Sequence, residues 1–199
     1  ASCRAAASTL GIPDPTPVWL PPLPPRLPLA QIDQDEPEDP AQPGVPIGLL
    51  DLPEAQEQVL SRWRPVEDGH LAISGGARTG RTSTLLTLAA GLVRRWSPDR
   101  LHLHVVTTGH HELSRLAELP HVGSVVSADQ PHRVARLVDG LTREAERRRA
   151  HDGDPDEASL QVLLVDGWET VTERLADVDH GRPVDSLLSL LRDGEPVGM

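Results

Sequence analysis

The 199-residue sequence lacks lysine, phenylalanine and tyrosine, and it contains one cysteine and four tryptophans. A lone cysteine excludes an internal disulfide and is typical of a protein from a reducing compartment. The scarcity of aromatic rings argues against a surface that binds single-stranded nucleic acid by base stacking. The core must therefore be built from leucine, valine, alanine and isoleucine.

Acidic residues outnumber basic ones, 30 against 19, so the formal net charge is −11. This balance argues against a protein that coats nucleic acid, although a local basic surface stays compatible with it. No apolar run in the sequence reaches the roughly 18 residues that a membrane-spanning helix needs. The first residues do not resemble a signal peptide and do not begin with methionine, so we expect a piece of a longer protein.

Proline divides the sequence into two parts. Residues 1–46 are acidic and rich in proline, as in "PDPTPVWLPPLPPRLP", and proline at this density disfavours helix and strand and favours an extended conformation. Two interpretations remain open, a solvated linker and an arm that packs on a domain surface through Val18, Trp19, Leu20 and Leu23. Residues 47–199 predict one folded domain.

Within this domain, strand-like and helical patterns alternate from residue 69 onward. Before that point, 47–52 is strand-like, and Pro53 followed by Glu54 predicts the start of a helix. Alternation indicates an α/β domain with a mainly parallel sheet flanked by helices, and we expect it to be truncated, with an exposed sheet edge. The predicted strands are 70–74, 101–106, 122–126 and 160–166, and the predicted helices are 82–95, 111–119, 131–150 and 183–192.

The stretch "GGARTGRT" (75–82) has the spacing of a phosphate-binding P-loop, G-x-x-x-x-G-K-[ST], with arginine in place of lysine. In such a loop, backbone N–H groups and the dipole of the following helix bind phosphate, and Thr82 places its hydroxyl on Mg²⁺. ATP and Mg²⁺ are therefore the expected cofactors. The predicted nucleotide-binding residues are Gly75, Gly76, Ala77, Arg78, Thr79, Gly80, Arg81, Thr82 and Ser83.

The second half of a P-loop site is an apolar strand that ends in an acid, and "VLLVDGWE" (162–169) fits this pattern. Asp166 is the expected ligand of the Mg²⁺ shell, whereas Gly167 stands where many ATPases carry the acid that polarises the attacking water. Glu169 is a candidate to replace that acid, or a surface acid at the start of a helix. Because Arg81 also departs from the motif, we expect nucleotide binding and doubt hydrolysis.

Two weaker clusters remain. Two of the four histidines between residues 102 and 111 share one face of a strand, so zinc is conceivable, but no cysteine and no well-placed acid assists them. The cluster consists of His102, His104, His110 and His111. Arg147, Arg148 and Arg149 end a predicted helix, where cations suit the helix dipole, or they reach into a neighbouring site.

Four segments together resemble the FtsK/SpoIIIE-type motor ATPases, most closely the EccC-like branch of type VII secretion. They lie in the family's order between residue 17 and about residue 192, and Leu119–Gly123 within the last is the most distinctive. The segments are "VWLPPLP" (18–24), "IGLLDLPEAQEQ" (47–58), "LAISGGARTGRTSTL" (71–85) and "LAELPHVGSVV" (116–126).

The resemblance implies an ATP-binding, RecA-like module of a ring motor, such as a hexamer, at the cytoplasmic face of a membrane. Its partners would be neighbouring modules or subunits, and its substrate a secreted protein or double-stranded DNA. The chain departs from the family at Arg81, at Gly167 and at "VVTTGHH" (105–111), where the family often has an aspartate-containing D-x-G-G stretch. It also lacks the later sensor strand, so it resembles a degenerate, truncated module.

Three functions therefore remain open: a nucleotide-binding module of a secretion ATPase, an active DNA translocase module, and an adaptor that binds a partner peptide without nucleotide. Salt-sensitive binding of duplex DNA favours the second, and partner binding without nucleotide binding favours the third.

Overall fold

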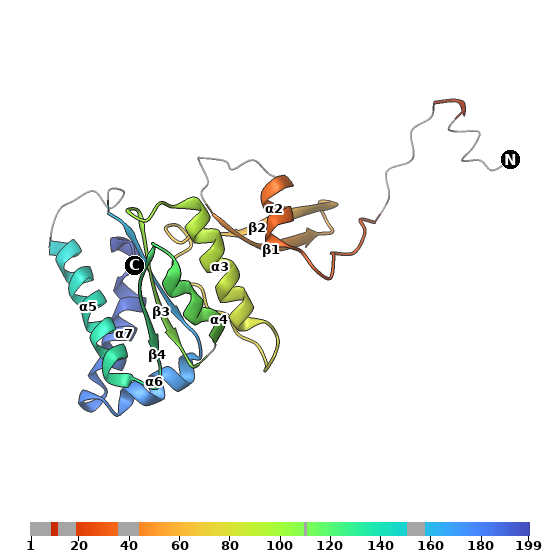
Figure 1. The fold of residues 1–199 in the computed structure, drawn as a ribbon. Coiled ribbons are helices and arrows are strands. Elements are labelled where there is room, and N and C mark those ends of the chain that lie inside the picture. The colour runs from red at the N-terminus through yellow and green to blue at the C-terminus, as the bar shows by residue number, and fades with distance from the viewer. Residues whose placement is uncertain (1–8, 12–18, 36–43, 110, 151–157) are drawn as a thin grey trace.

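The computed structural model describes residues 9–11, 19–35, 44–109, 111–150 and 158–199. Within them, β3 (Leu101–Thr107), β4 (Val122–Ser127) and β5 (Leu160–Val165) form a parallel sheet in the order β4-β3-β5 (Figure 1). Long connections that contain helices join these strands, as parallel pairing requires. The predicted α/β architecture with a parallel sheet is confirmed.

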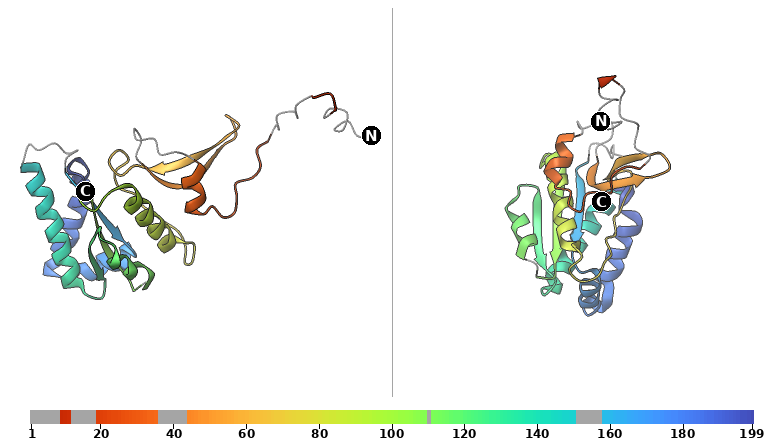
Figure 2. Two further views of the ribbon diagram at one scale, coloured as in Figure 1. Left: turned by 45° about the horizontal axis from the view of Figure 1, so that its top comes forward. Right: turned by 90° about the vertical axis from the view of Figure 1, so that its right-hand side faces the viewer.

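The helices cover both faces of this sheet (Figures 1 and 2). On one face, α3 (Arg81–Arg95) packs its buried Leu88 and Leu92 in a cluster with strand residues that include Val105. On the other face, Val106 joins a second cluster. Successive strand residues point to opposite faces, so β3 contributes to both cores. The second cluster also takes in α5 (Pro131–Ala150), α6 (Trp168–Ala176) and α7 (Arg182–Asp193).

Short elements complete this domain. The predicted helix at 111–119 is divided into α4 (His111–Ser114) and a 3₁₀ turn, η1 (Arg115–Glu118). The segment between η1 and β4 is joined to the end of α3, because buried His121 donates from Nε2 to the carbonyl oxygen of Trp96 (2.8 Å). Two further 3₁₀ turns, η2 (Asp179–Gly181) and η3 (Glu195–Val197), flank α7.

The prediction of a helix that starts at Pro53 is wrong. Residues 45–63 form a separate antiparallel hairpin of β1 (Val45–Leu52) and β2 (Glu57–Trp63). Its turn contains Gln56 with φ +54°, a conformation that non-glycine residues rarely adopt. The hairpin docks on α3, where Val45 lies against Gly91, and Trp63 donates from its indole nitrogen to the Gly69 carbonyl (3.0 Å).

The proline-rich part contains a helix that its composition disfavours, α2 (Leu29–Asp35), which Pro28 precedes. Ile32 of this helix is buried. Upstream of α2, Gln58 of β2 donates to the Pro21 carbonyl (2.7 Å), but Trp19 is 82% exposed. The arm therefore contacts the hairpin without burying Trp19, and Val18 lies outside the described residues.

The prediction of a strand at 70–74 is also wrong, since these residues form neither helix nor strand. They precede the P-loop as an irregular segment that pairs with no strand of the described sheet. In the described part of the chain, no helix combines the length and apolar character needed to span a bilayer.

Candidate nucleotide-binding site

The P-loop segment leads directly into α3, as the sequence predicts. Gly80 precedes the helix with φ +94°, which glycine adopts readily. Gly75 is required for a different reason: a Cβ there would lie 2.5 Å from the hydroxyl oxygen of Thr79, which itself donates to the Gly76 carbonyl (2.9 Å). The loop therefore leaves its exposed backbone and the N-terminus of a 15-residue helix facing solvent, an arrangement suited to phosphate.

Asp166 and Thr82 meet although they are far apart in the sequence. The Thr82 hydroxyl donates to Oδ1 of Asp166 at 3.3 Å, and Asp166, at the end of β5, is 6% exposed. A third residue completes this group, because the Thr108 hydroxyl donates to Oδ2 of Asp166, also at 3.3 Å. Sequence reasoning missed Thr108: a threonine after a strand is common, and its proximity to Asp166 depends on the pairing of β3 with β5.

Gly167 cannot simply be replaced by an acid. Its φ is +81°, and a Cβ at this position would lie 2.6 Å from Cγ2 of Thr108. The backbone conformation and the threonine methyl group therefore both disfavour a side chain at position 167 unless Thr108 moves. The absence of an acid at position 167 thus agrees with the presence of Thr108 beside it.

The two arginines of the loop are exposed. Arg78 has φ +62°, and Cγ of Arg81 lies 3.7 Å from the position that a Cβ on Gly75 would occupy. Both side chains line the same cavity as Thr82 and Asp166, so both can contribute positive charge to an anion there.

This cavity has a volume of about 1210 Å³ and extends from the P-loop along β5. The N–H of Leu160 donates to the carbonyl of Arg100, directly before β3, and that of Asp166 donates to Val106 in β3, whereas the N–H of Gln161 donates in the opposite direction to the Gly198 carbonyl (2.8 Å). By alternation, the N–H groups of Leu163 and Val165 point away from β3. In the described sheet β5 is an edge strand, and it borders the cavity.

The residues present fit ATP with Mg²⁺. The cavity exceeds the roughly 300–1,000 Å³ of typical small-molecule sites, and it combines the loop backbone with two arginines. Thr82 and Asp166 offer oxygen atoms 3.3 Å apart, and oxygen is the ligand that Mg²⁺ prefers. Mg²⁺ usually keeps several waters and phosphate ligands, so two protein oxygens suffice.

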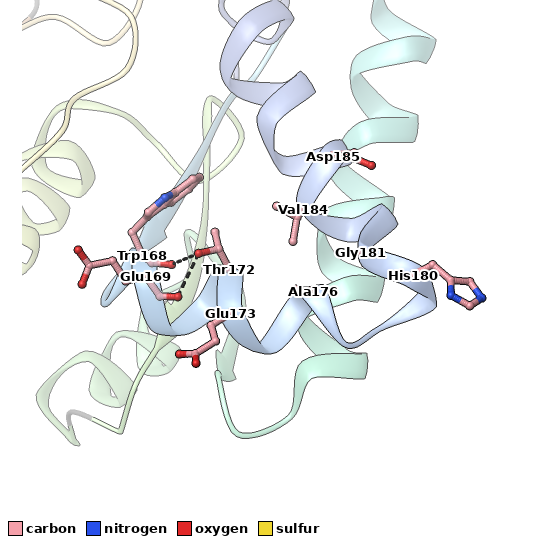
Figure 3. Close-up of a pocket in the computed structure, with 9 residues that line it drawn as sticks. All are labelled: Trp168, Glu169, Thr172, Glu173, Ala176, His180, Gly181, Val184 and Asp185. Atoms are coloured by element: carbon pink, nitrogen blue, oxygen red, sulfur yellow. Dashed lines mark hydrogen bonds between the residues drawn. The ribbon is translucent and has the colours of Figure 1, made fainter.

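Glu169 lies in the first turn of α6, exposed, and borders the cavity. It also lines a second pocket of about 570 Å³ between α6 and α7, where its carboxylate points away from the other labelled side chains (Figure 3). Glu173 and Asp185 line this pocket too, so its lining is acidic and unsuited to phosphate. The role of Glu169 as a replacement acid stays a prediction.

The described histidines do not form a metal site. His104 and His102 are linked through Gln161, whose Oε1 lies 3.1 Å from Nε2 of His104 and whose Nε2 lies 2.8 Å from Nδ1 of His102. Burial lowers the pKa of His104, and the nearby His102 lowers it further, while the bond to Gln161 raises it. Among the described residues no three His, Cys, Asp or Glu side chains gather to hold an ion, and His110 lies outside them.

The three arginines at the end of α5 contact their own domain. Arg147 and Arg148 pair with Glu144 (2.6 and 2.8 Å), and these bonds lower the pKa of Glu144 to about 2. Arg148 also donates to the Val197 carbonyl (2.9 Å), and Arg149 to the Asp193 carbonyl (3.2 Å). These contacts hold the end of α7 and the segment after it against α5. They argue against the interpretation that the three arginines extend into a neighbouring site.

Comparison with known proteins agrees with this geometry. An ESX secretion system protein EccC from Geobacillus thermodenitrificans is 28% identical over 93% of this chain, which spans 13% of that protein. The cytoplasmic domain of the Thermomonospora curvata type VII secretion ATPase EccC superposes with a TM-score of 0.71 at 26% identity, covering 94% of this chain and 25% of the other.

A second Thermomonospora curvata structure, EccC ATPases 2 and 3 in complex with a signal sequence peptide, gives a TM-score of 0.61 at 27% identity. It covers 82% of this chain and 32% of the other. The chain thus corresponds to a small part of each relative, and its fold is that of their P-loop ATPase domains. The model of the FtsK/SpoIIIE family matches residues 29–153, and the chain belongs to this family.

Proposed function

We propose that this chain is an ATP-binding module of a type VII secretion motor, with weak or absent hydrolysis. The observation that carries the proposal is the asymmetry of the site. The phosphate-binding loop leads into α3 and Thr82 bonds to Asp166, whereas position 167 has no acid, and Thr108 together with a positive φ disfavours one there.

In the proposed complex, the loop N–H groups and the N-terminus of α3 bind the phosphates. Arg81 supplies the charge that lysine supplies in the usual motif, and Thr82 and Asp166 hold the cation. Bound Mg²⁺ would neutralise charge on the phosphate oxygens. Every one of these interactions supports binding, and none of them activates a water molecule.

Two features support weak hydrolysis. Phosphoryl transfer depends on positioning within a fraction of an ångström, and the long, planar guanidinium of Arg81 differs in reach and shape from an ammonium. Water activation has no candidate at position 167, which leaves the exposed Glu169. The nucleotide therefore acts as a bound ligand that stabilises the module or its contact with a neighbour.

The partners follow from the relatives. One solved Thermomonospora curvata structure contains ATPases 2 and 3 of EccC in complex with a signal sequence peptide. We therefore propose neighbouring ATPase modules in a ring, for example a hexamer, and a secreted protein as the substrate, at the inner face of the cell membrane. Duplex DNA is the less favoured substrate because the chain carries a net charge of −11.

The test is a titration of a fluorescent ATP analogue with Mg²⁺, together with a phosphate-release assay. The wild type should bind, and Arg81→Ala should bind about tenfold or more weakly, since a charge-assisted hydrogen bond contributes about 1.5–3 kcal/mol. Arg133→Ala, an exposed arginine on α5, is the matched control and should bind like the wild type.

Phosphate release should not exceed background in any of these proteins. Release that disappears in Asp166→Ala would restore the motor function. A folded wild type that binds no nucleotide would instead favour the adaptor function.

A further inference from the structure

The carboxylate of Asp166 is held from two sides by two hydroxyl groups. Thr82 on α3 donates to one oxygen, and Thr108, in the loop after β3, donates to the other, each at 3.3 Å. Because the two bonds come from different elements, they restrict the rotation of the Asp166 carboxylate. Asp166 is also buried, and a hydrogen bond to a buried carboxylate contributes more than one in water.

The backbone explains why Thr108 reaches Asp166. The carbonyl of Val106 accepts the N–H of Asp166 (2.9 Å), and the carbonyl of Thr107 accepts the N–H of Ala128 (2.8 Å). Both neighbours of β3 thereby hold its last residues in place. The chain then turns at Gly109, which has φ +110° and donates its N–H to the Thr107 hydroxyl (3.3 Å). Thr108 is thus presented from a rigid strand end.

The two threonines have different tasks when a cation is present. The lone pairs of the Thr82 hydroxyl are needed for the cation, because Thr82 occupies the P-loop position that faces Mg²⁺. Thr108 lies outside the P-loop, and its hydroxyl serves the carboxylate directly. The methyl group of Thr108 has a separate effect, because its Cγ2 lies close to the position that a Cβ on residue 167 would occupy. The Thr108 side chain therefore bonds to Asp166 and leaves little room for a side chain at position 167.

We propose that Thr108 is a positioning residue that orients the Asp166 carboxylate toward the cation of a bound nucleotide. This inference rests on the proposed function.

Thr108→Val and Thr108→Ser form a matched pair for the test. Valine keeps the shape and removes the hydroxyl, whereas serine keeps the hydroxyl and removes the methyl group. With Mg²⁺, the affinity for a fluorescent ATP analogue should fall about tenfold in Thr108→Val and stay within about twofold in Thr108→Ser. In EDTA, all three proteins should bind alike. An unchanged affinity of Thr108→Val with Mg²⁺, or an equal loss in EDTA, would overturn the proposal.

A nucleotide-free measurement separates this inference from the proposed function. Urea unfolding of Thr108→Val, Asp166→Ala and the double variant forms a cycle in which we expect non-additive losses, because the two residues share one bond. Additive losses would overturn the orientation of Asp166 by Thr108, whatever the nucleotide does. Coupled losses in a protein that binds no nucleotide would overturn the proposed function and uphold that orientation.

Discussion

Thr108 and Gly167 face each other where β3 and β5 end, and their contact decides what position 167 can carry. A Cβ on residue 167 would lie 2.6 Å from Cγ2 of Thr108, at φ +81°. A left-handed conformation costs a non-glycine residue about 1–2 kcal/mol before any overlap is counted. A side chain at position 167 is therefore disfavoured as long as threonine occupies position 108.

Gly167→Ala tests this contact. We expect it to destabilise the protein by more than about 1 kcal/mol, from the backbone conformation and the overlap together. In the Thr108→Ser background the methyl group is gone while the backbone cost remains, so the loss should be smaller. Urea unfolding of the four proteins measures both losses, and equal losses in the two backgrounds would contradict the contact.

His104 gives the protein a pH-dependent stability. Burial lowers its pKa, so the unfolded chain binds the proton more readily than the folded one. The stabilisation is complete above the ordinary histidine value of about 6.5 and is lost as the pH falls toward the lower value of the folded state. His104→Gln should flatten the stability profile in this window relative to the wild type.

The profile is measured as the urea midpoint between pH 7.5 and 5. Glu144 does not interfere, because its stabilisation is lost only from about pH 4.5 toward its lowered pKa of about 2. An unchanged slope in His104→Gln would contradict the assignment.

At the scale of elements, the docking of the hairpin on α3 depends on a glycine. A Cβ on Gly91 would overlap Cγ1 of Val45, the first residue of β1. Glycine costs a helix interior about 1 kcal/mol relative to alanine, and here the close approach of the hairpin offsets that cost. The hairpin and the P-loop domain are thus connected through one face of the helix that also begins the nucleotide site.

Gly91→Ala and Gly140→Ala make a paired test of this packing. Gly140 lies in α5 with no atom within 4 Å of an added Cβ, so alanine there should stabilise the protein by up to about 1 kcal/mol. Gly91→Ala should destabilise it instead, because overpacking costs about 1–3 kcal/mol. Thermal unfolding measures both, and stabilisation by Gly91→Ala would show that the hairpin is not packed as described.

The sequence predicts those elements whose signals are local. The apolar runs at β3, β4 and β5 and the amphipathic pattern of α5 gave their positions to within one residue. The strand-like run at 47–52 lies within β1, but the turn and β2 are not predicted, because Pro53 suits a turn as well as a first helical turn and Gln56 carries no signal for a positive φ. The segment 70–74 has a strand pattern, yet in the described structure it lines the same cavity as β5 and pairs with no strand.

The site follows the same division. The spacing of residues in the sequence identifies the P-loop and Asp166, and the structure brings Thr82 and Asp166 together. Thr108 was not visible, since its role arises from the parallel pairing of β3 with β5. Residues whose function depends on such a tertiary contact need the fold before they can be found.

At the scale of the whole molecule, the proposed function combines a site that binds nucleotide with weak or absent hydrolysis. The chain spans only a part of its relatives, 13% of one EccC and 25% of a solved cytoplasmic domain. A module of this kind need not produce work itself. Because binding stabilises the state that binds, it can report nucleotide to the rest of a motor.

The most direct measurement is the identity of the nucleotide that stays on the protein. The wild type is incubated with ATP and Mg²⁺, separated from free nucleotide, and the bound fraction is analysed by chromatography. The account predicts that ATP is recovered intact, and that Asp166→Asn retains less of it. Recovery of ADP with stoichiometric phosphate, abolished in Asp166→Asn, would contradict the account and identify an active hydrolase.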